Sequence, residues 1–256
     1  MMAGGISLDP DAQAFLNAAG ITNATITTAI DTLVIQLKAI GVWNKMKAIY
    51  PFVGQTATTH KFNLKNPADS NAAFRLVFFG GWTHSANGAL PNGTNAYADT
   101  FFSPNSSLTI SSAHFSKYNR NNDLAGIKVD GSSEVPSSQT FFQQNYTGAN
   151  ACIGDVASLA IYIPSDTRGL IAITRTASNA VKVFRNGIQI ASNTSTITQI
   201  PTRTVFIGAR NDGGPMFYNS YEAAFASIGD GLTDTESANY YTAVQAFQTT
   251  LNRQVI

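Results

Sequence analysis

The sequence predicts an all-β protein, an antiparallel two-sheet β-sandwich with helices at both ends of the chain. From about residue 57 to 228 the chain consists of short runs rich in Val, Ile, Phe, Tyr and Thr, separated by clusters of Gly, Asn, Pro and Ser. Strands joined by turns give this pattern. Helical spacing of apolar residues occurs only outside that stretch. A length of 256 residues suits one large β domain with a short accessory segment.

The N-terminal region predicts a helical hairpin. Asp9 is a suitable N-cap for a first short helix, and Gly20 can end it. A second helix follows, because apolar residues recur every three or four positions over 26–40, and Gly41 is placed to stop it. We therefore assign residues 1–54 to an N-terminal arm and this hairpin.

An apolar stretch follows the hairpin and leads into the sandwich. It contains Trp43, Ile49, Tyr50 and Phe52, and we expect it to close the base of the sandwich in preference to forming a partner groove. The second helix is nearly as apolar as a buried helix. Part of its apolar stripe is therefore expected to stay exposed and to contact a neighbouring molecule.

At least nine candidate strands follow, which indicates a sandwich. They are residues 74–79, 113–118, 125–129, 159–163, 170–174, 181–185, 188–192, 205–209 and 223–228. The strongest local signal is alternation that meets Asn186-Gly187, because this pair tolerates the positive φ of a tight hairpin turn. Residues 86–96 and 119–123 are polar and rich in Asn or Gly, and are predicted to be loops.

The C-terminal region predicts a helix. Thr233 and Glu236 have the spacing of a capping box, and Val244, Phe247 and Leu251 follow at helical spacing. We assign 55–256 to a β-sandwich closed by this helix.

Composition excludes several classes of function. The chain has 16 Lys and Arg against 15 Asp and Glu, a formal net charge of +1, and no basic run, so nucleic acid is not an expected partner. Cys152 is the single cysteine, which excludes an internal disulfide and a paired-cysteine zinc site; we expect it to be a small core residue. No apolar run is long enough to span a bilayer, and residues 1–10 lack the pattern of an export signal.

Two late stretches resemble a known fold family. They are VFRNGI at 183–188 with FIGA at 206–209, and ASIGDGLTDTE at 226–236. They are similar to the late hairpin, the following strand and the closing strand-to-helix turn of concanavalin A-like (laminin G-like) jelly-roll domains. The resemblance covers about the last third of the chain and implies a jelly-roll over 55–232.

The N-terminal region resembles a different group of sequences. The segment from DAQAF at 11–15 to MKAIYPFV at 46–53 is similar to one that precedes such domains in bacteriophage fibre, tail and head proteins. This resemblance implies a virion structural protein, made in the host cytoplasm, that contacts other virion proteins and recognises a host-surface glycan. A homo-oligomer is expected, with a trimer as the first guess because fibres and spikes commonly use threefold symmetry.

The residues argue against an enzyme. Related jelly-roll glucanases carry Glu-x-Asp-x-Glu on one strand, whereas the three glutamates here, Glu134, Glu222 and Glu236, are never four apart. His60 and His114 are expected to be half-buried or solvated strand residues, and no Gly-x-Ser-x-Gly elbow accompanies the histidines. Carbohydrate binding without turnover is the expected activity. A glycan-degrading jelly-roll enzyme and a free carbohydrate-binding module are the alternatives.

Sugars are held by aromatic faces together with amide and carboxylate partners, and two regions of the chain contain both. The candidate carbohydrate-binding residues are Trp82, His84, Asn95, Tyr97 and Asp99, with Asn211 and Asp212 as a second rim. The competing interpretation is that Trp82 and Tyr97 are core anchors and that the asparagines only turn the chain.

No cofactor or metal is required by the sequence. The resemblance allows for a bound calcium ion, because such domains often place an Asp and several carbonyls near the sugar. However, the chain has no Asp-x-Asp-x-Asp-Gly loop, and isolated Asp-Gly pairs at Asp130, Asp212 and Asp230 are commoner in turns.

Overall fold

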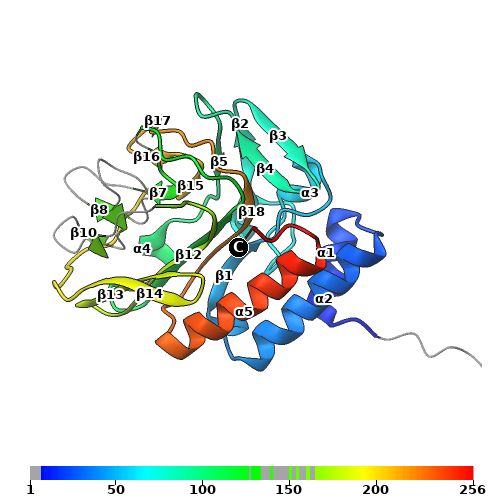
Figure 1. Ribbon diagram of the computed structural model, residues 1–256, viewed down its shortest axis with the longest axis horizontal. Helices are drawn as coiled ribbons and strands as arrows, with labels where there is room; N and C mark the ends of the chain where they lie inside the picture. The colour runs from blue at the N-terminus through cyan, green and yellow to red at the C-terminus, as the bar shows by residue number, and fades with distance from the viewer. Residues whose placement is uncertain are drawn as a thin grey trace, which may run out of the picture.

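The computed structural model describes residues 7–126, 128–133, 139–140, 150–151, 154–155, 160–161 and 165–255. These residues form two large β-sheets, two short strand pairs and a layer of helices (Figure 1). The fold is the predicted two-sheet jelly-roll sandwich, and its sheets are antiparallel except where β16 pairs with β7. The predicted helices at both ends of the chain are also present.

The larger sheet has eight strands in the order β14-β13-β12-β6-β18-β4-β3, and β1 also pairs with β18. Its strands are β1 (Met46–Tyr50), β3 (Trp82–Ser85), β4 (Gly88–Pro91), β6 (Ala113–Asn119), β12 (Gly169–Ala177), β13 (Ala180–Arg185), β14 (Ile188–Asn193) and β18 (Ala223–Gly229).

The smaller sheet has six strands in the order β17-β16-β7-β15-β5-β2. They are β2 (Val77–Phe79), β5 (Tyr97–Asp99), β7 (Gly131–Ser133), β15 (Phe206–Ile207), β16 (Arg210–Asn211) and β17 (Pro215–Met216). Two short pairs complete the described strands: β8 (Gln139–Thr140) with β10 (Gly154–Asp155), and β9 (Asn150–Ala151) with β11 (Ala160–Ile161).

Three long helices cover the face of the larger sheet that points away from the smaller one. They are α1 (Pro10–Ala19), α2 (Ala24–Ala39) and α5 (Asp234–Thr250), and they lie side by side (Figure 1). Their ends are where the sequence predicts: Asp9 caps α1, Gly20 ends it in the left-handed region, and Thr233 with Glu236 forms the capping box of α5. The short helices are η1 (Trp43–Lys45), α3 (Ala57–His60), η2 (Asn71–Ala73) and α4 (Pro104–Ser107). Among the described helices, none combines the length and the apolar character needed to cross a bilayer.

Two hydrophobic cores result from this layering. The inner core lies between the sheets and includes Phe115 and Ile228, whereas the outer core lies between the larger sheet and the helices and includes Phe225. The apolar stripe of α2, including Leu33 and Val34, is buried in the outer core. Most of the stripe is therefore covered by α1, α5 and the sheet, and only its end residues Ile26 and Ile40 are partly exposed.

The apolar stretch after the hairpin is buried as expected. Trp43 and Ile49 lie in the outer core, and Tyr50 and Phe52 in the inner core. However, Met46–Tyr50 is a strand, β1, that pairs with β18, and the candidate strands did not include it. Four of its five residues are buried, so its sequence lacks the alternation that marks a half-buried strand.

Other expectations need correction. The polar stretch 86–96 is not only a loop, because Gly88–Pro91 is β4 and pairs with β3. Residues 125–129 form no strand where they are described, and the sheet resumes at Gly131. Of 159–163 only Ala160–Ile161 is described, as β11. Cys152 lies outside the described residues.

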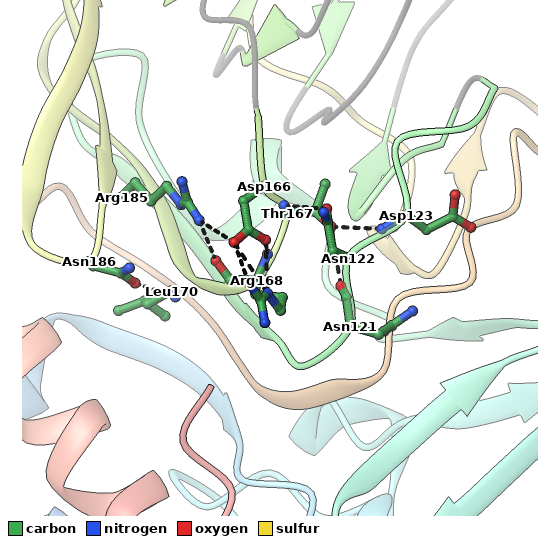
Figure 2. Close-up of polar contacts among 9 residues, drawn as sticks. All are labelled: Asn121, Asn122, Asp123, Asp166, Thr167, Arg168, Leu170, Arg185 and Asn186. Carbon is green, nitrogen blue, oxygen red and sulfur yellow. Dashed lines mark hydrogen bonds and ion pairs between the residues drawn. The ribbon is translucent and has the colours of Figure 1, made fainter. Parts of the chain in front are cut away.

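The Asn186-Gly187 hairpin is confirmed. Both residues have positive φ, 50° and 77°, and they connect β13 to β14. The side chain of Asn186 also accepts a hydrogen bond of 2.9 Å from the amide of Leu170. The turn is therefore tied to the start of β12, as Figure 2 shows.

The loops beside this hairpin hold one another through polar contacts (Figure 2). Asp166 pairs with Arg168 at 2.9 Å and with Arg185 at 3.4 Å. Thr167 donates from its amide to the side chain of Asn122 at 3.0 Å. The loop after β6 and the segment before β12 are thereby joined, and these polar groups satisfy one another.

Buried polar groups join α5 to the larger sheet. The hydroxyl of Tyr240 lies 2.7 Å from that of Ser227 and 3.0 Å from that of Ser116. His114 on β6 contacts Ser227 through Nε2 at 3.2 Å. His114 is fully buried, so the expectation of a half-buried or solvated strand residue is wrong. Burial lowers the pKa of this imidazole to about 3.

Arg253 anchors the end of the chain beneath the sandwich. Its guanidinium is 1% exposed and donates to the carbonyls of Phe52 at 2.8 Å, Pro51 at 3.1 Å and Ala224 at 3.0 Å. These carbonyls belong to the segment after β1 and to β18. A single cation therefore satisfies backbone groups from two parts of the fold.

Acid should destabilise the protein through its buried histidines. The folded-state pKa of His114 lies below the unfolded value, so the unfolded state binds more protons as the pH falls below about 6.5. We expect this histidine to reduce the free energy of unfolding by about 2 kcal/mol between pH 7 and pH 5. The free energy of unfolding of the His114→Gln variant should fall by about 2 kcal/mol less than that of the wild type over this interval. Urea unfolding at each pH measures both. Equal losses in the wild type and the variant would contradict this assignment.

Candidate functional site

The outward face of the smaller sheet carries a row of three aromatic side chains, Phe79, Tyr97 and Phe206, which we call the aromatic row. The rings of Phe79 and Tyr97 stack with centroids 4.8 Å apart and planes 12° apart, and Tyr97 lies 4.6 Å from Phe206. The register of the strands explains the row, because Phe79 pairs with Tyr97 across β2 and β5. The intervening Ala98 and Ile207 point into the inner core.

Phe79 is the exposed end of this row. Phe79 is 42% exposed and lies on β2, the edge strand of the smaller sheet. Phe206, at the other end, is 7% exposed. A flat apolar ring at the edge of a sheet, supported from behind by a second ring, offers a rigid surface for a planar or ring-shaped ligand.

Polar groups lie beside the aromatic row. Asp99 follows Tyr97 on the same face of β5, accepts a hydrogen bond of 2.8 Å from the amide of Phe101, and bonds with the side chain of Thr204. Burial raises the pKa of its carboxyl. Asn211 donates to the carbonyl of Thr204 at 2.8 Å. Thr204 therefore links Asp99 to Asn211, two of the residues that the sequence placed in separate clusters.

Charged side chains surround Asp212, the residue that follows β16. Asp212 pairs with Arg203 at 3.0 Å and with Arg210 at 3.5 Å. The guanidinium of Arg210 also lies 5.6 Å from the centre of the Phe217 ring. Asp212 is thus held between two cations, and its carboxylate orients both of them.

Trp82 is placed differently from the sequence-based expectation. It lies on β3, is half-buried and packs against the inner core. Its indole Nε1 donates to the carbonyls of Phe79 at 3.0 Å and Tyr97 at 3.2 Å. Trp82 therefore links the edge of the larger sheet to β2 and β5, and supports the aromatic row from below.

His84 and Asn95 also serve the scaffold. Nδ1 of His84 lies 2.9 Å from Nδ1 of His60, which is buried at the end of α3 and is not the strand residue expected from the sequence. Burial lowers the pKa of both rings, to about 3 for His60. The side chain of Asn95 accepts from the amide of Gly81 at 3.0 Å and from Asn92 at 2.8 Å. These contacts shape the turns around β3 and β4.

The structure thus divides the seven candidate residues. Tyr97, Asp99, Asn211 and Asp212 gather on or beside the outward face of the smaller sheet, whereas Trp82, His84 and Asn95 support it. Sequence reasoning missed Phe79, Phe206 and Thr204. The alternation in Val77-Phe78-Phe79 was the available signal, since Phe78 packs on the inner core and its neighbour must point outward.

The described part of the chain offers no metal centre. It contains no group of three or more His, Cys, Asp and Glu side chains that could hold an ion. The aspartates of the three Asp-Gly pairs contact cations instead: Asp130 contacts Lys117, Asp212 contacts Arg203 and Asp230 contacts Lys47. These carboxylates do not fit a calcium site, because calcium needs several oxygen ligands with lone pairs directed at it.

Comparison with solved structures supports the fold. The chain is similar to domain 4 of an extracellular arabinanase from Geobacillus stearothermophilus, solved with arabinotriose, at 16% identity and a TM-score of 0.52, over 77% of this chain and 98% of that one. It is also similar to the binding domain of botulinum neurotoxin serotype D, at 10% identity and a TM-score of 0.51, over 82% of this chain and 53% of that one. Trypanosoma rangeli sialidase matches at 10% identity and a TM-score of 0.50, over 86% of this chain and 39% of that one.

The comparisons with family models and with curated sequences find no match. At identities this low the structural likeness shows the fold alone. The chain is a two-sheet β-sandwich, and it spans about two fifths of the sialidase chain and about half of the toxin binding-domain chain.

The different roles of Trp82 and Phe79 can be separated by stability. Trp82→Ala should lower the free energy of unfolding by about 3 kcal/mol, because it empties part of the inner core and removes the indole donor. Phe79→Ala should cost less than about 1 kcal/mol, because the ring lies on an edge strand, is 42% exposed and leaves no cavity in the core. Urea unfolding at neutral pH measures both. Equal losses would show that Phe79 belongs to the scaffold.

Proposed function

We propose that this chain is a bacteriophage virion structural protein, a head, tail-fibre or decoration component, whose sandwich binds host-surface glycan on the aromatic row. The observation that carries the binding proposal is the exposed ring of Phe79, stacked on Tyr97, with Asp99 on the same face. Aromatic faces bind the C–H groups of a sugar ring, and carboxylate and amide groups bind its hydroxyls.

The surface favours weak binding at each site. The row is flat, and Phe79 stands at the edge of the sheet, so little of a sugar would be removed from water. Several copies on one particle would turn weak sites into strong attachment, because the second contact forms at a high effective concentration. This reasoning links the binding proposal to the virion proposal.

The virion assignment draws its support from the N-terminal sequence resemblance. We propose localisation in the virion after synthesis in host cytoplasm, contacts with other virion proteins, and self-association with a trimer as the first guess. Because most of the stripe of α2 is buried, we expect the docking surface to involve other parts of the chain. Mass spectrometry of purified particles tests this assignment directly, and a chain missing from all particles would contradict it.

We further propose that glycan is bound without turnover. Glycoside hydrolysis uses two carboxylates across the scissile bond. Glu222 is paired with Arg120 at 2.8 Å, and Glu236 accepts from the amide of Thr233 and contacts Lys45 at 2.6 Å. Both of these glutamates have structural partners, and neither is one of the residues that border the aromatic row.

A free carbohydrate-binding module is the second candidate function. The likeness to domain 4 of the arabinanase favours it, because nearly the whole of that chain is covered. A glycan-degrading enzyme is the third. Particle composition separates a virion protein from a free module, and accumulation of reducing ends with host polysaccharide would identify an enzyme.

Removal of the exposed ring should abolish most of the binding. We expect Phe79→Ala to weaken binding to host cells or to a glycan array by about tenfold per site, the equivalent of one aromatic contact of roughly 1.4 kcal/mol. The protein should be displayed in several copies on beads so that weak binding at each site can be detected. Asp99→Asn should also weaken binding, at an unchanged melting temperature.

The matched control is Ile188→Ala. Ile188 is 72% exposed and lies on β14, the edge strand of the larger sheet, so the change removes an even more accessible apolar side chain elsewhere. This variant should bind like the wild type. If Ile188→Ala and Phe79→Ala bind equally, the aromatic row is not the binding surface.

A further inference from the structure

A lysine and an aspartate meet inside the inner core. Nζ of Lys117 lies 2.9 Å from Oδ1 of Asp130, and the two side chains are 1% and 0% exposed. Lys117 belongs to β6 of the larger sheet, and Asp130 directly precedes β7 of the smaller sheet. The contact therefore connects the two sheets of the sandwich, away from the aromatic row.

The charged form of this pair is costly. Each ion loses its hydration on burial, and the mutual attraction compensates only in part. Burial lowers the pKa of the Lys117 amine, although Asp130 opposes this effect. Transfer of one proton from the ammonium to the carboxylate gives a neutral amine beside a carboxylic acid. These are the two groups that condense to an amide.

The surroundings hold the two groups in position. Nδ2 of Asn119 donates to both oxygens of Asp130, at 3.1 and 3.2 Å. The backbone carbonyl of Asp130 accepts from the amide of Gly208 at 3.0 Å. The ring of Tyr221 lies 5.5 Å from Nζ of Lys117 and closes the other side. Fixed neighbours of this kind raise the effective concentration of one reactant around the other by many orders of magnitude.

We propose that Lys117 and Asp130 condense to an isopeptide bond that covalently joins the two sheets. The neutral amine attacks Cγ of the protonated carboxyl, and the donor of Asn119 stabilises the negative charge that develops on the carboxyl oxygen. A C–N bond forms and a C–O bond breaks. The hydroxyl leaves with an amine proton as one water molecule, so the step needs no oxidant, reductant or co-reactant.

Intact mass spectrometry of the purified protein tests this proposal. The wild type should be lighter than its sequence mass by one water molecule, completely or after prolonged incubation of the folded protein. Lys117→Arg should have its full sequence mass, because a guanidinium does not condense with a carboxyl group. The matched control is Lys182→Arg, which changes an exposed lysine paired with Asp234 and should keep the loss.

Peptide mapping of the wild type locates the bond and does not depend on a variant that folds. Trypsin should leave residues 76–120 joined to residues 129–168, because a modified Lys117 is not cleaved and the intervening residues contain no other Lys or Arg. A wild type with its full sequence mass would overturn the proposal. So would a loss of water without the joined peptides, because a succinimide at Asp130-Gly131 gives the same mass.

Discussion

The larger sheet must be covered on both faces, and most of the structure follows from this constraint. All seven residues of β6 and all seven of β18 are buried. The smaller sheet covers one face of these strands and the three long helices cover the other. The polar residues on the two strands consequently need partners inside the protein. Ser116 and Ser227 find theirs in Tyr240, and Lys117 finds Asp130.

The features that could be predicted from the sequence are local. A turn such as Asn186-Gly187 or a capping box such as that of Thr233 depends on a few neighbouring residues, so a short stretch of sequence determines it. Strand β1 depends on β18, about 180 residues away, and has apolar residues on both faces. Its sequence therefore resembles a continuation of the helical hairpin. The short strands β3, β4 and β5 were missed because three or four residues are too few to show alternation, and the turns between them are rich in Gly and Asn.

The sequence predicted several residues of the candidate site, but it did not predict how they are arranged in space. Tyr97 and Asp99 lie two residues apart on β5, so they share a face, but only recognition of β5 as a strand would have shown this. Trp82 is of a residue type that often binds sugars, but here it links the two sheets. A tryptophan contributes equally well to a core and to a ligand surface, and the residue type alone does not distinguish the two.

The position of β18 also affects how a nascent chain acquires this fold. β18 lies between β6 on one side and β1 and β4 on the other, yet Ser227 follows its neighbour Ser116 by 111 residues. The ribosome therefore makes the central strand after all the strands that flank it. Contacts of such long range form slowly, and unpaired strand edges readily join those of other chains. Until β18 inserts, β1, β4 and β6 each present an open edge, and this interval is when the growing polypeptide most needs a chaperone.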